Sequence, residues 1–152
     1  MTHPISPALL QPRQDAAAKL LLLTARAELT AAQAEEIQQL AAHVTDWDYF
    51  VETSANKFSI PLSYRHLNAF ASDVVPKTTL DRMRRLAKLS GLHSLKNASA
   101  LVAFHRACIE TLGIKYVYMK GVALSRQFNR EIADRFSRDV DILVEEKSFR
   151  RV

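Results

Sequence analysis

This chain of 152 residues has little cysteine and glycine and no long apolar run. Its single cysteine, Cys108, excludes an internal disulfide framework and is typical of proteins in a reducing cytoplasm. With 3 glycines, the chain is expected to be mostly helical and to have few tight turns. The apolar run Leu20–Leu23 is too short to span a bilayer, so we expect no membrane segment. Together these absences predict a cytoplasmic protein.

The composition predicts a folded chain with a mild preference for anionic ligands. Hydrophobic residues make up 48% of the sequence, which is enough for a core. The formal net charge of +5 favours nucleotides, nucleic acids or acidic proteins as ligands. A cluster of basic residues, Arg82, Arg84, Arg85 and Lys88, leaves two interpretations open. It contacts a nucleic-acid backbone, or it is a solvated helix face on which Asp81 pairs with Arg85.

Most of the chain is predicted to be helical. Residues 1–13 contain three prolines, which disfavour regular structure, and are expected to form a flexible leader. Residues 14–113 are predicted to be a helical region, because apolar residues recur there at helical spacing. Pro61 and Pro76 are expected to separate successive helices within this region.

Several residues predict where individual helices begin and end. Thr30 is a candidate N-cap, and Gln33 is placed to complete a capping box with it. Asp46 can cap the next helix in the same way. Gly91 is expected to kink or end a later helix, and Gly113 is expected to end the last one.

The sequence pattern changes after Gly113. Residues 114–119 are rich in β-branched and aromatic side chains and predict a strand, whereas residues 122–130 predict a helix. Residues 139–144 predict a second strand. Residues 114–152 therefore form a predicted strand–helix–strand unit, and the predicted fold class is α+β, mostly helical.

Two carboxylates, Asp139 and Asp141, lie at alternate positions of the second predicted strand. Such side chains project from the same side of a strand. Neighbouring acids repel unless a cation lies between them, and Mg²⁺ prefers carboxylate oxygens together with substrate phosphates. Upstream, Gly121 permits close approach of a phosphate, and Lys120 offsets its charge. The alternative is a pair of surface acids on an edge strand that follows an ordinary turn.

The segment Lys120-Gly121-x-Ala-Leu, followed by Arg135-x-x-x-Asp139-x-Asp141-x-Leu-Val, resembles the uncharacterised nucleotidyltransferase family of the DNA polymerase β-like superfamily. In that superfamily the glycine turn faces a nucleoside triphosphate. The Asp-x-Asp pair binds two Mg²⁺ ions, and a third acidic residue on a later strand completes the site. The resemblance therefore implies the first strand–helix–strand of a nucleotidyltransferase-type domain.

The resemblance also implies roles for the residues around the acids. Asp139 and Asp141 would be the metal ligands and the catalytic pair. The nucleotide would be bound by a set of small and basic residues: Lys120, Gly121, Ser125, Arg135 and Arg138. Guanidinium groups suit bidentate phosphate contacts, although both arginines also suit the simpler role of neutralising neighbouring acids. The chain departs from the superfamily at Val122, where a second glycine or a serine is usual.

The implied function is transfer of a nucleotidyl group from an NTP–Mg²⁺ complex to a protein, a small molecule or an RNA end. No third carboxylate is evident, because Glu145 lies too far along the strand from Asp139. The chain is therefore expected to be a truncated domain, inactive unless a partner subunit or a second copy completes it. The alternative is a non-catalytic helical module that binds a partner protein.

Overall fold

Helices dominate the chain, and a two-stranded antiparallel sheet follows them, so the predicted α+β class is confirmed. The structure is a computed structural model, and it describes residues 12–119 and 139–151. The chain divides into two compact units, Met1–Arg84 and Arg85–Val152, which we name the N-terminal unit and the C-terminal unit.

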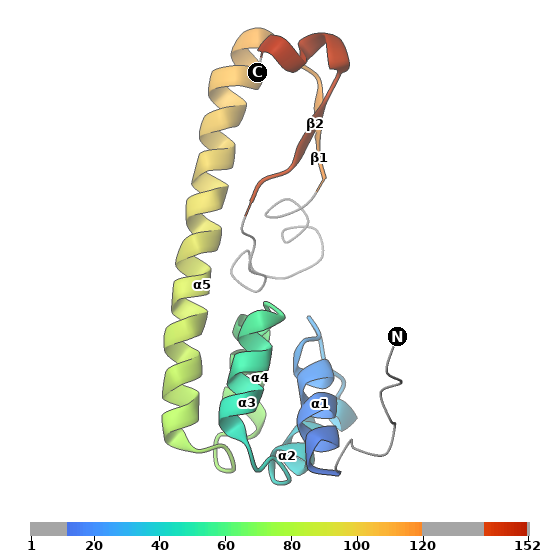
Figure 1. The fold of residues 1–152 in the computed structure, drawn as a ribbon, viewed down its shortest axis with the longest axis vertical. Coiled ribbons are helices and arrows are strands. Elements are labelled where there is room, and N and C mark those ends of the chain that lie inside the picture. Colours follow the sequence, from blue (N-terminus) through green and yellow to red (C-terminus); the bar gives the residue numbers. More distant parts are fainter. Residues whose placement is uncertain (1–11, 120–138, 152) are drawn as a thin grey trace, which may run out of the picture. The chain divides into compact units, whose positions relative to one another are not determined.

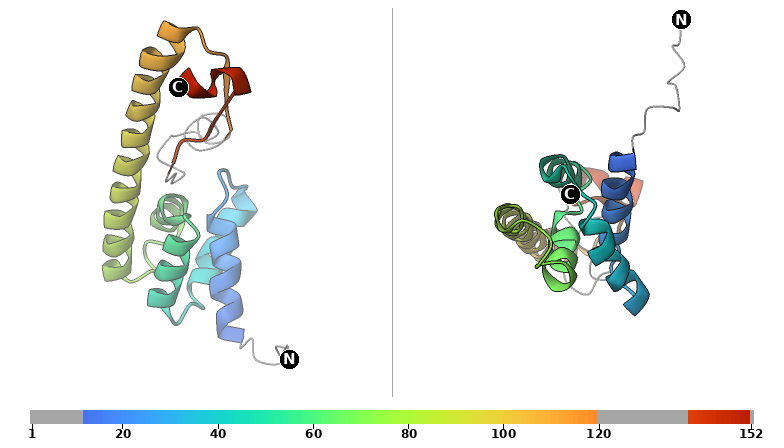
Figure 2. Two further views of the ribbon diagram at one scale, coloured as in Figure 1. Left: turned by 45° about the horizontal axis from the view of Figure 1, so that its top comes forward. Right: turned by 90° about the horizontal axis from the view of Figure 1, so that it is seen from below.

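The N-terminal unit is built from helices that pack through their apolar faces (Figures 1 and 2). Helix α1 packs on α2, α3 and α4, and α4 packs on α2 and α3. Side chains from every one of these helices are fully buried and form the core, including Leu20, Ile37, Phe50 and Leu67. The bounds are α1 (Pro12–Thr24), α2 (Ala31–Ala41), α3 (Trp47–Asn56) and α4 (Ile60–Phe70).

Local signals in the sequence set the helix starts. The backbone N–H of Gln33 donates to Thr30 Oγ1 over 3.3 Å, and the backbone N–H of Thr30 donates to Gln33 Oε1 over 3.0 Å. The predicted capping box is therefore confirmed. Asp46 Oδ1 accepts from the backbone N–H of Tyr49 over 2.9 Å, which confirms the second predicted cap.

Side chains of α4 hold the end of α1. The hydroxyl of Thr24 lies 3.1 Å from that of Ser63, and both residues are fully buried. His66 Nδ1 lies 3.0 Å from the backbone oxygen of Thr24, and because a carbonyl only accepts, this nitrogen carries the proton. Carbonyl groups at a helix end lack partners within the helix, so this bond stabilises the α1–α4 junction.

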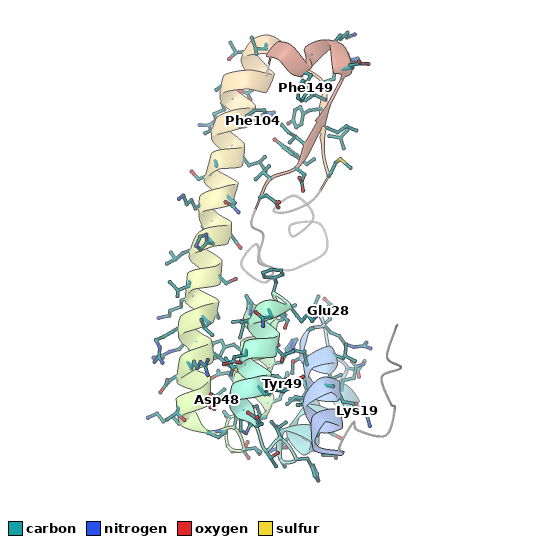
Figure 3. All side chains as sticks on the ribbon, in the orientation of Figure 1. Lys19, Glu28, Asp48, Tyr49, Phe104 and Phe149 are labelled. Carbon is teal, nitrogen blue, oxygen red and sulfur yellow. The ribbon has the colours of Figure 1, made fainter. Side chains whose placement is uncertain are left out.

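Helix α5 (Lys77–Phe104) begins in the N-terminal unit, where an exposed ion pair joins it to α3. Arg82 Nη1 lies 2.6 Å from the carboxylate of Asp48, the residue labelled on α3 in Figure 3. Asp81 lies 3.9 Å from Arg84, so the structure places this acid beside Arg84 and the predicted partner Arg85 was wrong. Exposed ion pairs of this kind add little stability. Burial of the apolar faces therefore contributes most of the stability of the N-terminal unit.

We expected Gly91 to kink or end a helix; α5 continues past it, so the helix does not end there. It passes into a π-helical turn, η2 (His105–Glu110), which the sequence did not predict. Gly113 then adopts a left-handed backbone with φ of 64°, which confirms it as the helix-ending residue.

The strands are shorter than predicted. Strand β1 spans Tyr116–Tyr118, β2 spans Ile142–Val144, and the 3-10 helix η4 (Glu146–Arg151) follows. The predicted helix over residues 122–130, and residues 1–11 of the predicted leader, lie outside the described residues. Among the helices that the structure describes, none combines the length and the hydropathy that a membrane crossing would require.

Replacing Leu20 tests whether the α1 contacts carry the stability of the N-terminal unit. Leu20 is fully buried, whereas Leu22 on the same helix is 74% exposed. Leu20→Ala should lower the free energy of unfolding by about 2–5 kcal/mol, because it leaves a cavity. The matched control Leu22→Ala should change it by less than about 0.5 kcal/mol. Urea denaturation followed by circular dichroism measures both, and equal losses would contradict the assignment of the core.

Candidate functional site

The candidate site is built on the β1–β2 pair. The strands run antiparallel, with Tyr116 opposite Val144, Val117 opposite Leu143, and Tyr118 opposite Ile142. The N–H of Met119 then donates to the carbonyl oxygen of Asp141 over 3.0 Å. The pairing therefore extends beyond β2 and fixes the backbone of one acid of the predicted pair.

The two faces of this strand pair have different surroundings. Val117 and Leu143 lie opposite each other and are 60% and 57% exposed. Tyr116 and Tyr118 lie on the other face and are half-buried, with ring centroids 4.7 Å apart in an edge-on arrangement. Side chains alternate along a strand, so the tyrosines cover the face opposite Val117 and Leu143.

Asp139 and Asp141 lie just before β2, although both were predicted within the strand. The side chain of Asp139 is exposed and that of Asp141 is half-buried. Strand β2 begins later than predicted. The described residues that can pair with it end at Met119, whose N–H donates to the carbonyl of Asp141. The two acids are close in the chain, and Asp139 is open to solvent, whereas the carboxylate oxygen Oδ2 of Asp141 is buried.

The two acids can supply some, but not all, of the ligands of a magnesium site. Mg²⁺ commonly uses one or two carboxylates and keeps water and substrate phosphates as its other ligands, a role that two aspartates can fill. Within residues 12–119 and 139–151, no group of three or more His, Cys, Asp or Glu side chains is placed to hold an ion. A third protein ligand is therefore not provided by the described part of the chain.

Glu145 is engaged elsewhere, as expected from its position. Its carboxylate lies 2.8 Å from Lys147 Nζ, and the hydrogen bond and charge of Glu145 raise the pKa of Lys147 above its ordinary value. The ammonium group thus partly neutralises the carboxylate. This ion pair favours a surface role for Glu145 rather than a role beside Asp141.

The remaining predicted site residues share one position in the chain: they follow β1 and precede Asp139. They lie in residues 120–138, outside the described part of the structure, and their roles stay predictions: Lys120, Gly121, Ser125, Arg135 and Arg138. Lys120 and Gly121 come directly after Met119 in the sequence, and Met119 is bonded to Asp141.

Sequence reasoning missed a polar network on the tyrosine face. Tyr116 Oη lies 2.6 Å from His105 Nδ1, and His105 Nε2 lies 3.3 Å from Glu110 Oε1. His105 is hydrogen-bonded, but its side chain is 35% exposed, so it is not a core residue. The signal that could have pointed to the contact is Gly113, which reverses the chain between His105 and Tyr116.

A comparison with protein families identifies the family of this chain. A family model described as "Uncharacterised nucleotidyltransferase" matches residues 43–152, so the chain belongs to this family. The match covers α3, α4, α5 and both strands, and it includes Asp139 and Asp141. No curated protein and no solved structure matches the chain. The class of the protein is therefore nucleotidyltransferase-like.

The surroundings of Tyr118 on the tyrosine face change its pKa, and this change can be measured. Burial, followed by the hydrogen bond with Tyr116 and its charge, raises the pKa of Tyr118 from 10.0 to about 12. Tyr116→Phe should lower the pKa of Tyr118 toward 10.0, because the phenyl ring accepts no such bond. Tyr49→Phe, on the exposed side of α3, is the matched control and should leave the pKa unchanged. The ultraviolet absorbance of tyrosinate measures both.

The sign of the linked stability change follows from the raised pKa. Neutral Tyr118 stabilises the folded state fully below the ordinary pKa of 10.0, and this contribution is lost as the pH rises toward about 12. The wild-type protein should therefore lose more stability over this range than Tyr116→Phe. Parallel pH–stability curves for the two proteins would contradict the hydrogen bond.

Proposed function

We propose that the chain binds an NTP–Mg²⁺ complex at Asp139 and Asp141 and transfers a nucleotidyl group to an acceptor hydroxyl. The observation that carries this proposal is the family match, which includes both acids. The hydrogen bond from the N–H of Met119 to the carbonyl of Asp141 also supports the proposal. It joins the segment that carries the two acids to the strand that precedes Lys120 and Gly121 in the sequence. Two carboxylates, together with a lysine and a glycine of the same motif, supply the residue types that phosphate and metal binding require.

The distribution of charge supports an anionic substrate in the C-terminal unit. Residues 85–152 contain 13 Lys and Arg against seven Asp and Glu, a formal net charge of +6. Residues 1–84 contain eight Lys and Arg against nine Asp and Glu, a net charge of −1. The excess positive charge of the protein thus lies entirely in the unit that carries the acids, where it favours binding of a triphosphate.

In the proposed reaction the acceptor oxygen forms a bond to the α-phosphorus of the NTP. The bond from this phosphorus to the bridging oxygen breaks, pyrophosphate leaves with its electron pair, and the acceptor proton is released to water. Asp139 and Asp141 hold the metal through their carboxylates. When bound, Mg²⁺ neutralises phosphate charge and helps to activate the attacking oxygen.

The remaining residues bind and orient the nucleotide in this proposal. Gly121 lets the backbone approach the phosphates, and Lys120 offsets their charge. Arg135 and Arg138 contact phosphate oxygens through their guanidinium groups, and Ser125 donates a hydrogen bond. Transfers of this kind depend on positioning and charge neutralisation, which these residue types provide. The reducing, NTP-rich cytoplasm is the compartment that suits this chemistry and the single cysteine.

A second candidate function, a non-catalytic interaction module, is favoured by apolar residues that face solvent. Four apolar side chains of α5 are between 49% and 64% exposed: Leu89, Leu92, Leu95 and Val102. Large exposed apolar groups close together on one element mark surfaces that bind other proteins. In this alternative the acids have no metal role.

Removing both carboxylates separates the two functions. Asp139→Asn combined with Asp141→Asn should reduce Mg²⁺-dependent ATP binding by at least about 100-fold, because the amides carry no charge to hold the metal. The matched control changes two neighbouring acids in the same way, Glu145→Gln with Glu146→Gln, and should retain binding. Isothermal titration calorimetry of each protein with ATP and with GTP, with and without Mg²⁺, measures the difference in binding.

Wild-type protein that binds neither ATP nor GTP in the presence of Mg²⁺ would overturn the enzymatic proposal and favour the interaction module. Equal loss of binding in the Glu145→Gln, Glu146→Gln control would also count against it, because the effect would then follow net charge rather than the Asp pair. Circular dichroism checks that all variants fold.

A further inference from the structure

A continuous network of side chains joins the π-turn η2 to the strand β1. Tyr116 Oη lies 2.6 Å from His105 Nδ1, and their rings meet edge-on with centroids 5.5 Å apart. On its other side His105 Nε2 lies 3.3 Å from Glu110 Oε1. One imidazole thus links the strand to both ends of the turn.

The chemistry of the groups fixes the direction of each hydrogen bond. A carboxylate only accepts, so His105 Nε2 carries the proton that points to Glu110. In the neutral ring Nδ1 is then an acceptor, and the hydroxyl of Tyr116 donates to it. The network therefore runs in one direction, from Tyr116 through His105 to Glu110.

The π-turn is what places His105 and Glu110 in this arrangement. A π-turn inserts an extra residue into a helix, widens it locally, and is often found at functional sites. Here the hydroxyl of Thr111, just after the turn, donates to the carbonyl of Arg106, the second residue of the turn, over 3.1 Å. The turn is thus held by side chains of the same segment.

The network reaches the candidate site through the backbone. Tyr116 and Tyr118 belong to β1, and the N–H of Met119, one residue further, donates to the carbonyl of Asp141. A two-stranded pair is only marginally stable by itself, so its geometry depends on contacts to other elements. The bond between Tyr116 and His105 is such a contact, and it lies on the face opposite Val117 and Leu143.

We propose that His105 and Tyr116 are positioning residues: they hold β1 against the π-turn and thereby fix the backbone of Asp141 through Met119. Neither residue touches the substrate in this scheme. Their effect on nucleotide binding rests on the proposed function, whereas their effect on the Met119–Asp141 bond does not. The two effects are therefore measured separately.

Four substitutions in the full chain test the proposal. Tyr116→Phe removes the donor and keeps the ring, and His105→Leu removes the acceptor. His105→Asn is the conservative variant, because its amide oxygen branches from the γ-carbon as Nδ1 does. Tyr118→Phe is the matched control, since it removes a hydroxyl from the same strand face and leaves the bond between Tyr116 and His105 in place.

The direct readout is hydrogen exchange of the Met119 amide, followed by nuclear magnetic resonance. Loss of one hydrogen bond that supports the strand should speed exchange about three- to tenfold in Tyr116→Phe and His105→Leu. The combined variant should be no faster than either single one, because both remove the same bond. His105→Asn and Tyr118→Phe should exchange within about twofold of wild type.

The second readout is the dissociation constant for ATP measured with Mg²⁺. It should rise by about three- to tenfold in Tyr116→Phe and His105→Leu, and His105→Asn should restore it. Urea denaturation shows whether the variants remain folded under the assay conditions, so that a general loss of stability is not mistaken for a local effect.

Wild-type exchange of the Met119 amide in Tyr116→Phe would overturn the positioning role. So would failure of His105→Asn to restore protection while the variant is folded. If wild type binds no nucleotide, the proposed function fails, and the exchange rates still decide whether these residues fix Asp141. Faster exchange with unchanged ATP binding would overturn the link between the network and the nucleotide site.

Discussion

The antiparallel pairing of β1 with β2 is the constraint on which the candidate site depends. It brings together two segments that are far apart in the chain, and its last bond fixes the backbone of Asp141. A pair of three-residue strands has too few hydrogen bonds to be stable by itself. The strands therefore need support from the helical segment before them, and the bond between Tyr116 and His105 provides part of it.

The two units differ in the physical basis of their structure. The N-terminal unit buries a continuous set of apolar side chains from α1 to α4, and three of its buried polar residues, Thr24, Ser63 and His66, are hydrogen-bonded to one another or to backbone. The C-terminal unit carries the excess positive charge and the acids of the family motif. The apolar core and the acids of the proposed site thus lie in different parts of the sequence.

The features that the sequence predicted correctly depend on neighbours in the chain. Thr30 and Gln33 form a capping box, and Gly113 ends a helix, through bonds and angles that span only a few residues. Gly91 does not end its helix, because the intrinsic cost of one glycine is small beside the rest of a 28-residue helix. The family was identified correctly because its motif is a local pattern around Asp139 and Asp141.

The features that were missed depend on distant contacts. The contact between His105 and Tyr116 requires a π-turn and a reversal at Gly113, and hydrophobic periodicity reports neither. Strand lengths were overestimated because β-propensity does not reveal how much of a segment has a partner. The nucleotide-binding roles predicted for residues between Lys120 and Arg138 rest on the motif alone, since these residues lie outside the described part of the chain.

The widened turn at His105–Glu110 also constrains how the gene of this protein can change in length. Successive residues of an ordinary helix are rotated by about 100°, so deletion of a single codon here would restore regular winding and turn the following chain by that angle. His105 would then no longer meet Tyr116. Insertions and deletions should be far better tolerated in the connection between α1 and α2, which no predicted site residue occupies.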